Sequence, residues 1–185
     1  NTLRYILGNL SDFNPAKDMV DYEKMDLLDK YMMSRLTKLV NEVVDAYDEF
    51  KFYKVVSLIN NFCIKDLSNF YFDILKDKLY TYKKDSCSRR ASQSVLYELL
   101  SNLLPLLSPI LSFTSEEAWQ EAHQIGLVHE ESVFLSEIIS LERLKKYKNS
   151  ELEKEFETVI EIRNIVNVEL EKLRKCNIIG SYLEV

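Results

Sequence analysis

The feature that most constrains the fold is a long segment, residues 55–82, in which apolar side chains recur at steps of three and four. No Gly or Pro interrupts this segment. Such spacing places the apolar residues on one broad face of an α-helix, and 28 residues at 1.5 Å per residue give a helix about 42 Å long. Because an apolar face of this length is stable only when other helices cover it, the segment predicts the central helix of a bundle.

The turn-forming residues also favour an all-α architecture. The 185 residues include only 3 Gly and 3 Pro, and scarce turn residues indicate long elements with few reversals. Further apolar stripes at helical spacing occur in residues 1–10, 25–47, 89–111 and 151–175. We therefore predict an antiparallel helical bundle over residues 1–140. Residues 141–185 are expected to form a linker, a long acidic helix and the start of a C-terminal extension.

Local signals suggest how the predicted helices begin and are connected. Asp85 or Ser86 is placed to cap the helix at 89–111, and Thr114 with Glu117 fits a capping box for the helix that carries Trp119. Between the helices we expect a loop at 11–23, an extended apolar triplet at 133–135 and a Lys-rich linker at 141–150. The final stretch, IIGSYLEV at 178–185, is typical of a turn followed by the start of a strand.

The cysteines indicate a reducing environment. There are 3 Cys, widely spaced and without a CxxC pair, which argues against a disulfide framework and against a zinc site built from these residues alone. We therefore expect a cytoplasmic protein. No apolar stretch reaches the roughly 18 residues that a membrane-spanning helix needs.

Motifs of catalysis are nearly absent from the sequence. It contains no glycine-rich nucleotide-binding loop, no GxSxG and no HExxH. A helical bundle invites a di-iron site, but that site needs Glu-x-x-His pairs, and neither His123 nor His129 has a Glu three residues before it. We expect no metal in this chain. A free-standing metalloenzyme remains an alternative that bound metal in a purified sample would support.

The charge distribution restricts where a polyanion can bind. The formal net charge is −6; residues 1–113 carry 15 acidic and 15 basic side chains, whereas residues 114–185 carry 15 acidic and 9 basic ones. A nucleic acid therefore gains nothing from the overall electrostatic field of the protein and must bind locally on the neutral part, residues 1–113.

Arg can contact phosphates or stack on unpaired bases, and Asn can form hydrogen bonds with base edges. The residues expected to face outward for this purpose are Asn1 with Arg4, Arg35 with Lys38, and Arg89 with Arg90. Ordinary solubilising charges are the alternative.

The order of several segments adds a family resemblance. NTLRYILGNLSDFNP, LDKYMMSRL, NFCIKDLSNFYFDILKDKLY, SRRASQSVLYELL, PLLSPILSFTSEEAW and ESVFL follow one another along the chain. Their order and spacing resemble the C-terminal helical region of class I isoleucyl-tRNA synthetases of bacterial type. The end, VIEIRNIVNVELEKLRKCNIIGSYLEV, resembles the helix and strand that open that family's C-terminal extension, so the resemblance covers essentially the whole chain.

The resemblance implies an anticodon-binding domain that holds the stem and anticodon loop of isoleucine tRNA. A Rossmann catalytic domain elsewhere in such an enzyme ligates isoleucine to the tRNA with ATP and Mg²⁺, and a zinc motif lies near its C-terminus; none of these parts falls within the 185 residues. The resemblance therefore implies a non-catalytic part of a monomeric ligase, without a cofactor of its own. The family's Asn-x-x-Arg helix carries over to Asn1 and Arg4. By exposure, Arg35, Lys38, Arg89 and Arg90 are expected to contact the RNA backbone.

The sequence departs from the family pattern at one place that bears on binding. Where the family commonly has Asp-Arg before an aromatic residue, this chain has Asp29-Lys30-Tyr31. Lys cannot make the planar two-pronged contacts of Arg. A helical protein-interaction or scaffold module without an RNA partner is the alternative function.

Overall fold

The structure, a computed structural model, describes residues 1–137 and 141–180, and all regular elements within them are helices. The predicted all-α fold is confirmed. The chain divides into two compact units, Asn1–Lys148 and Asn149–Val185. In chain order the first unit contains α1 (Thr2–Asn9), α2 (Pro15–Asp18), the 3₁₀ helix η1 (Tyr22–Lys24), α3 (Leu27–Asp48), α4 (Phe52–Asn61), the π-helix η2 (Phe62–Tyr71), α5 (Phe72–Thr81), α6 (Cys87–Leu107), α7 (Ser112–Gln124), the 3₁₀ helix η3 (Val133–Leu135) and α8 (Leu141–Lys145).

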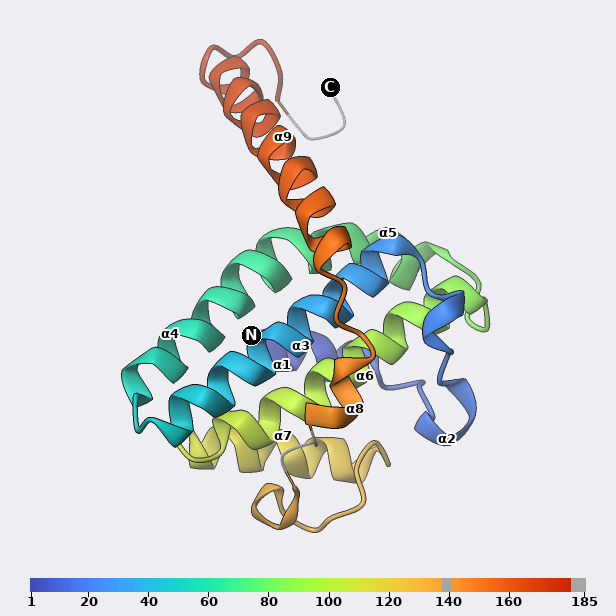
Figure 1. Ribbon diagram of the computed structural model, residues 1–185. Coiled ribbons are helices and arrows are strands. Elements are labelled where there is room, and N and C mark those ends of the chain that lie inside the picture. The colour runs from blue at the N-terminus through green and yellow to red at the C-terminus, as the bar shows by residue number, and fades with distance from the viewer. Residues whose placement is uncertain (138–140, 181–185) are drawn as a thin grey trace. The chain divides into compact units, whose positions relative to one another are not determined.

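The first unit is a bundle in which α3 and α6 pack against each other and carry most of the buried side chains. In Figure 1, α4 and α7 lie on opposite sides of this pair. The most buried helix is α6, not the segment at 55–82 that we expected to be central. Its small residues Ala91, Ser92 and Ser94 are buried along with all of its leucines except Leu107. The apolar stripe at 89–111 predicts one buried face, but α6 also buries polar side chains beside that stripe, among them Gln93, Glu98 and Asn102.

The helix predicted at 55–82 exists, but it is not uniform. Residues 52–81 are helical without a break, as α4, η2 and α5. The central part, η2, is a π-helix that buries Leu67, Phe70 and Tyr71. π-Helical turns are rare and often lie near functional sites. The apolar spacing of three and four does not distinguish the two helix types.

Of the capping signals predicted for the starts of α6 and α7, the one at α6 is present and the one at α7 is not. Ser86 caps α6, accepting a hydrogen bond from the Arg89 backbone N–H at 3.4 Å, as one of the two predicted caps. The capping box at Thr114 is wrong, because α7 already begins at Ser112 and Thr114 lies inside it. There the hydroxyl of Ser112 donates instead to the Ser108 carbonyl at 2.9 Å.

Three of the segments expected to be irregular contain short helices. The loop predicted at 11–23 contains α2, and its last two residues, 22 and 23, belong to η1. The triplet at 133–135 is the 3₁₀ helix η3 rather than an extended segment. The linker at 141–150 begins with α8, whose Leu144 is fully buried. Of the strand predicted at 178–185, residues 181–185 lie outside the described residues, and residues 178–180 are not in a strand.

The second unit is a single long helix, α9 (Ser150–Lys175), and the residues that follow it. The Asn149 side chain caps it by accepting from the Leu152 N–H at 3.0 Å. Glu151 and Glu153 lie in its first turn, and its last turn is basic. This charge order complements the helix dipole at both ends.

Candidate nucleic-acid interface

Asn1 and Arg4 are held at the surface by α1. The other side of this helix is anchored, since Ile6 is fully buried and the ring of Tyr5 stacks on Phe72 with centroids 4.2 Å apart. The Tyr5 hydroxyl also donates to the Phe72 carbonyl oxygen at 3.3 Å. Asn1 and Arg4 themselves are exposed, as predicted.

Arg35 and Lys38 lie together on α3 beside η2. The Nε of Arg35 donates to Oδ1 of Asp66 at 2.9 Å, and the two side chains are only 25% and 15% exposed. Lys38 is exposed. Both basic residues line a small cavity of about 90 Å³ that includes neither Asn1 nor Arg4. The predicted residues therefore form two separate pairs, and in the second pair Lys38 is the more accessible cation.

Arg89 is engaged inside the protein. Its Nη1 and Nη2 donate to the two carboxylate oxygens of Asp12 at 2.9 and 3.1 Å, and its Nε donates to the Leu79 carbonyl at 3.1 Å. This two-pronged pair fastens the segment after α1 to the start of α6. The prediction that Arg89 faces outward is wrong, because a carboxylate 77 positions earlier binds its guanidinium.

Arg90 is still more buried, at 8% exposure, so the prediction that it faces outward is also wrong. Its Nη1 donates to the Asp12 carbonyl and to Oε1 of Gln93, both at 2.9 Å. Carboxylates of Asp18 and Asp85 lie 3.5 and 3.2 Å from its guanidinium. Burial by itself would raise the pKa of Asp12, but hydrogen bonds from Arg89 and Gln93 and both arginine charges lower it below its usual value.

Asp29, in the segment that departs from the family pattern, is a buried structural residue. Its carboxylate accepts from the Tyr71 hydroxyl at 2.6 Å and from the Ser92 hydroxyl at 3.1 and 3.2 Å, and Lys78 lies 3.6 Å away. Lys30 points elsewhere: its Nζ donates to the Glu23 carbonyl at 3.1 Å. Asp29 on α3 thus contacts residues of η2, α5 and α6. The neighbouring Lys30, also in the first turn of α3, takes no part in this network.

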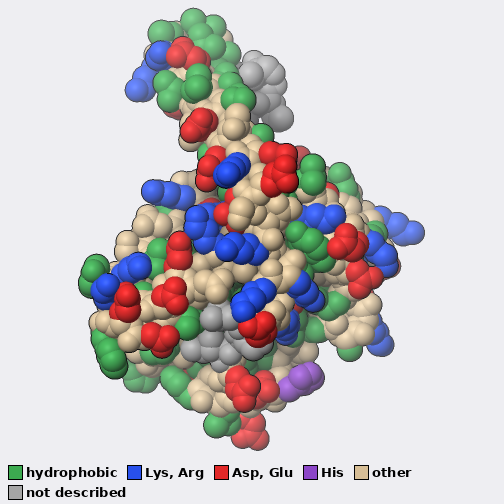
Figure 2. Space-filling view, in the orientation of Figure 1, with side chains coloured by type: hydrophobic (Ala, Val, Ile, Leu, Met, Phe, Trp, Pro, Cys, Tyr) green, Lys and Arg blue, Asp and Glu red, His purple; other side chains and the backbone are tan. Residues whose placement is uncertain are grey.

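A basic segment that we interpreted as a linker is docked on the bundle. In residues 141–148, Leu144 and Tyr147 are buried, and the Thr37 hydroxyl donates to the Leu144 carbonyl at 3.2 Å. Between and beside these anchors the segment exposes basic side chains: Arg143, Lys145, Lys146 and Lys148. Figure 2 shows Lys and Arg side chains gathered over α8 and the residues that follow it. The lysines of this segment are evident in the sequence, but no sequence pattern predicts that Leu144 and Tyr147 are buried.

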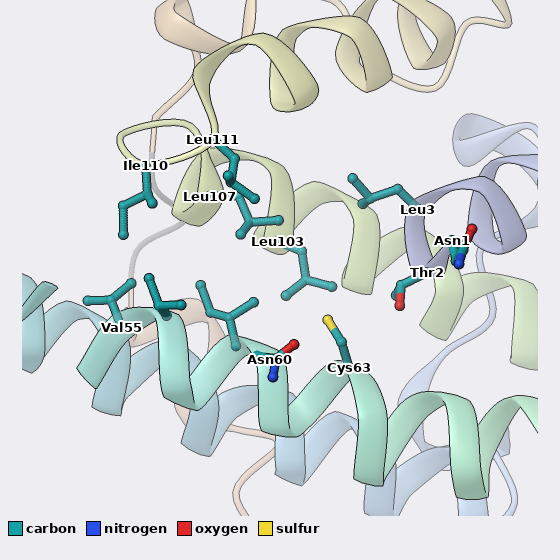
Figure 3. Close-up of a pocket in the computed structure, with 12 residues that line it drawn as sticks. Asn1, Thr2, Leu3, Val55, Asn60, Cys63, Leu103, Leu107, Ile110 and Leu111 are labelled. Atoms are coloured by element: carbon teal, nitrogen blue, oxygen red, sulfur yellow. The ribbon is translucent and has the colours of Figure 1, made fainter. Parts of the chain in front are cut away.

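An apolar cavity of about 460 Å³ lies between α1, α4 and α6. Figure 3 shows Cys63 pointing into it, opposite Leu103 and close to Thr2. Burial raises the pKa of the Cys63 thiol, which disfavours the reactive thiolate. Asn1 is among the residues that line this cavity, but the leucines, isoleucines and valines of its lining offer nothing to a phosphate.

Within residues 1–137 and 141–180, no group of three or more His, Cys, Asp or Glu side chains is arranged to hold a metal ion. None of the helices in the same ranges has the length and apolar character needed to cross a bilayer.

Comparison with known proteins identifies the class to which this bundle belongs. Residues 29–185 match the family described as the anticodon-binding domain of tRNA ligase. The chain therefore belongs to that family of helical anticodon-binding domains.

The similar proteins are isoleucine–tRNA ligases, which confirms the family resemblance found in the sequence. The chain is 44% identical over its full length to the isoleucine–tRNA ligase of Caldicellulosiruptor bescii and 42% identical to that of Natranaerobius thermophilus. It is 44% identical, over 97% of its length, to the ligase of Persephonella marina. The chain covers 20%, 19% and 19% of these three relatives, so it spans about a fifth of their length.

Proposed function

We propose that this chain binds the anticodon stem-loop of isoleucine tRNA as a non-catalytic part of an isoleucine–tRNA ligase. The observation that carries the proposal is the family match over residues 29–185, together with relatives that are isoleucine–tRNA ligases along the whole chain. This match favours tRNA binding over the alternative of a scaffold module without an RNA partner. The catalytic Rossmann domain, with its ATP and Mg²⁺, and the zinc motif belong to other parts of the monomeric, cytoplasmic enzyme.

The surface chemistry supports contacts at particular residues. Arg4 and Lys38 are exposed cations on two well-anchored helices, and Asn1 adds an amide that can bond a base edge. Arg35 contributes in a subsidiary way, because Asp66 already binds its Nε. Arg89 and Arg90 are assigned to the internal network with Asp12 rather than to RNA. With so few phosphate contacts on an acidic protein, binding should be weak and sensitive to salt.

Fluorescence anisotropy with a labelled anticodon stem-loop of isoleucine tRNA tests the proposal. Wild-type chain is expected to bind at low salt, with an affinity that falls as salt rises. Arg4→Ala and Lys38→Ala should each weaken binding and should each reduce the slope of log affinity against log salt by about 1.

The matched control is Lys76→Ala, which removes an exposed cation that is paired with Asp73 on α5. It should leave both the affinity and the salt slope unchanged. An unrelated stem-loop of the same length should bind more weakly. If the wild-type chain binds neither stem-loop at low salt, tRNA binding is overturned in favour of a protein-interaction or scaffold module without an RNA partner.

A further inference from the structure

A second cavity of the first unit, about 480 Å³ in volume, combines features that the proposed function has not used. Residues 19–23 line one side of it, and Arg143, Lys146 and Tyr147 line another. Glu98, from the middle of α6, is the most deeply buried residue in its lining. The volume is within the range of sites that hold small organic ligands.

Glu98 has an oxygen atom without a partner. The residue is 2% exposed, and its Oε1 forms an ion pair with Nη2 of Arg143. Its Oε2 is buried and accepts no hydrogen bond from any residue that the structure describes. A buried carboxylate oxygen without a donor is costly, and such a group in a native protein indicates a missing hydrogen-bond donor. In a cavity of this size, an N–H group of a bound ligand can supply that donor.

Aromatic rings line the same cavity. The rings of Tyr22 and Tyr147 have centroids 5.2 Å apart and are tilted by 49°. Each already attracts a cation: Nζ of Lys30 lies 5.4 Å from the centroid of Tyr22, and Nζ of Lys146 lies 4.7 Å from that of Tyr147. An aromatic face of this kind also stacks nucleobases, largely without regard to their sequence. Since Lys146 is exposed, its ammonium can move to a phosphate and leave the ring of Tyr147 to a base.

The charges of the cavity favour a single nucleotide over a duplex. Arg143 and Lys146 face the acidic residues Asp21 and Glu23, and Lys24 already pairs with Asp21 at 3.0 Å. A duplex would bring many phosphates against this mixed surface. One unpaired nucleotide can instead place its base beside Glu98 and its phosphate beside Lys146, so that each charge meets its complement.

We propose that this cavity binds one unpaired nucleotide of the tRNA, whose base carries an exocyclic amino group that donates to Oε2 of Glu98. Adenine, cytosine and guanine have such a group. Uracil has not, and its N3–H lies between two carbonyl oxygens that a carboxylate repels. The proposal rests on the proposed tRNA binding and adds to it a specificity-determining residue, Glu98, and a stacking residue, Tyr147.

The test uses the whole 185-residue chain and the labelled anticodon stem-loop of isoleucine tRNA. Each A, C or G of the loop is replaced in turn by uridine, and dissociation constants are measured by anisotropy. For wild-type chain, one replacement is expected to weaken binding about 5- to 150-fold, the usual effect of losing one good base contact. In Glu98→Gln this discrimination should disappear, because the amide N–H can donate to a uracil carbonyl.

Two variants keep the test independent of the buried glutamate. Tyr147→Leu retains an apolar anchor but no aromatic face, and should weaken binding of the unmodified stem-loop about 5- to 150-fold. Lys146→Gln should weaken it several-fold and reduce the salt slope. Helix content measured by circular dichroism must equal that of wild type for each variant, and Lys76→Gln is the control cation.

The possible outcomes separate this proposal from the proposed function. If wild-type chain binds the stem-loop but no uridine replacement is discriminated, the cavity proposal is overturned and tRNA binding stands. The same holds if folded Tyr147→Leu and Lys146→Gln bind like wild type. If wild-type chain does not bind the stem-loop at all, tRNA binding fails and the cavity proposal fails with it.

Discussion

Asp29 explains why a charged residue occurs in the interior of this bundle. It is fully buried at the first turn of α3, and donors from η2 and α6 satisfy its carboxylate. Burial raises the pKa of Asp29 above its usual value, and the charge of Asp26 adds to this, whereas Lys78, Tyr71 and Ser92 act in the opposite direction. A carboxylate with this many partners fixes the relative positions of the helices it touches.

The first prediction concerns the hydroxyl that bonds this carboxylate. Tyr71→Phe should lower the free energy of unfolding by about 1–3 kcal/mol, because a buried carboxylate loses a donor at 2.6 Å. The folded-state pKa of Asp29 is raised, so folding stability declines as pH rises from the usual Asp pKa through the folded one. Removing the hydroxyl raises that pKa further, and the loss should be largest above it. Urea unfolding at several pH values measures this.

The comparison for this prediction is Tyr82→Phe, at a tyrosine that is 48% exposed. It should leave the free energy of unfolding within about 0.5 kcal/mol of wild type. Equal effects of the two substitutions would contradict the role of the buried hydroxyl.

The second prediction concerns the network of Asp12. Asp12→Asn should destabilise the fold by about 2–4 kcal/mol at neutral pH, because the poorly exposed Arg89 loses its carboxylate partner and Arg90 loses one of the three carboxylates around it. The folded-state pKa of Asp12 is lowered. Its contribution is therefore complete above the usual Asp pKa and is lost as pH falls through the folded one. The gap between wild type and Asp12→Asn should close in acid, as followed by urea unfolding with exposed Asp77→Asn as the control.

At the scale of the helices, the sequence predicts which segments are helical better than it predicts the turns between them. The span of α3, Leu27–Asp48, differs little from the stripe at 25–47, since an amphipathic helix with one covered face has a clear period. The turn after α3 was less visible: Phe50 adopts a positive φ of 55°, where Gly is usual, and the Lys51 N–H donates to the Ala46 carbonyl at 2.8 Å. A bulky residue in that conformation gives no turn signal in the sequence.

The candidate site was only partly predictable, because exposure depends on partners distant in the chain. Arg4 and Lys38 lie opposite buried stripes on their own helices, and their exposure follows from local spacing. Arg89 resembles them locally, yet Asp12 binds it across 77 positions. The cavity beside Glu98 joins three segments, and no pattern within any one of them indicates the others.

The third prediction tests whether α8 is a docked element rather than a linker. Leu144→Ala removes a fully buried side chain and should destabilise the first unit by about 2–4 kcal/mol. It should also increase hydrogen exchange of the backbone amides in 141–147 more than elsewhere. The control is Leu135→Ala, at a leucine that is 66% exposed. Equal exchange in the two variants would mean that Leu144 does not hold α8.

At the scale of the whole molecule, the two units differ in how they are stabilised. The first has a contiguous core around α3 and α6. In α9, by contrast, Leu152 is the buried residue, and several apolar side chains are exposed: Val159, Ile162, Ile165, Val166, Val168 and Leu173. A helix of 26 residues exceeds the roughly 12–15 residues below which isolated helices are marginal. Its stability therefore depends on its caps and propensities more than on a core.

The fourth prediction follows from this difference. A chain ending after Lys148 should unfold in urea as one cooperative transition, because the core of the first unit is complete within it. It should bind the isoleucine tRNA stem-loop about as tightly as the full chain, since every residue proposed to contact RNA precedes Asn149. Circular dichroism and anisotropy measure these two properties. A separately made peptide of residues 149–180 should be helical, unfold without a sharp transition and bind no RNA. A shortened chain that folds but loses the stem-loop would show that the RNA contacts extend into the second unit, and the residues proposed here would then be an incomplete interface.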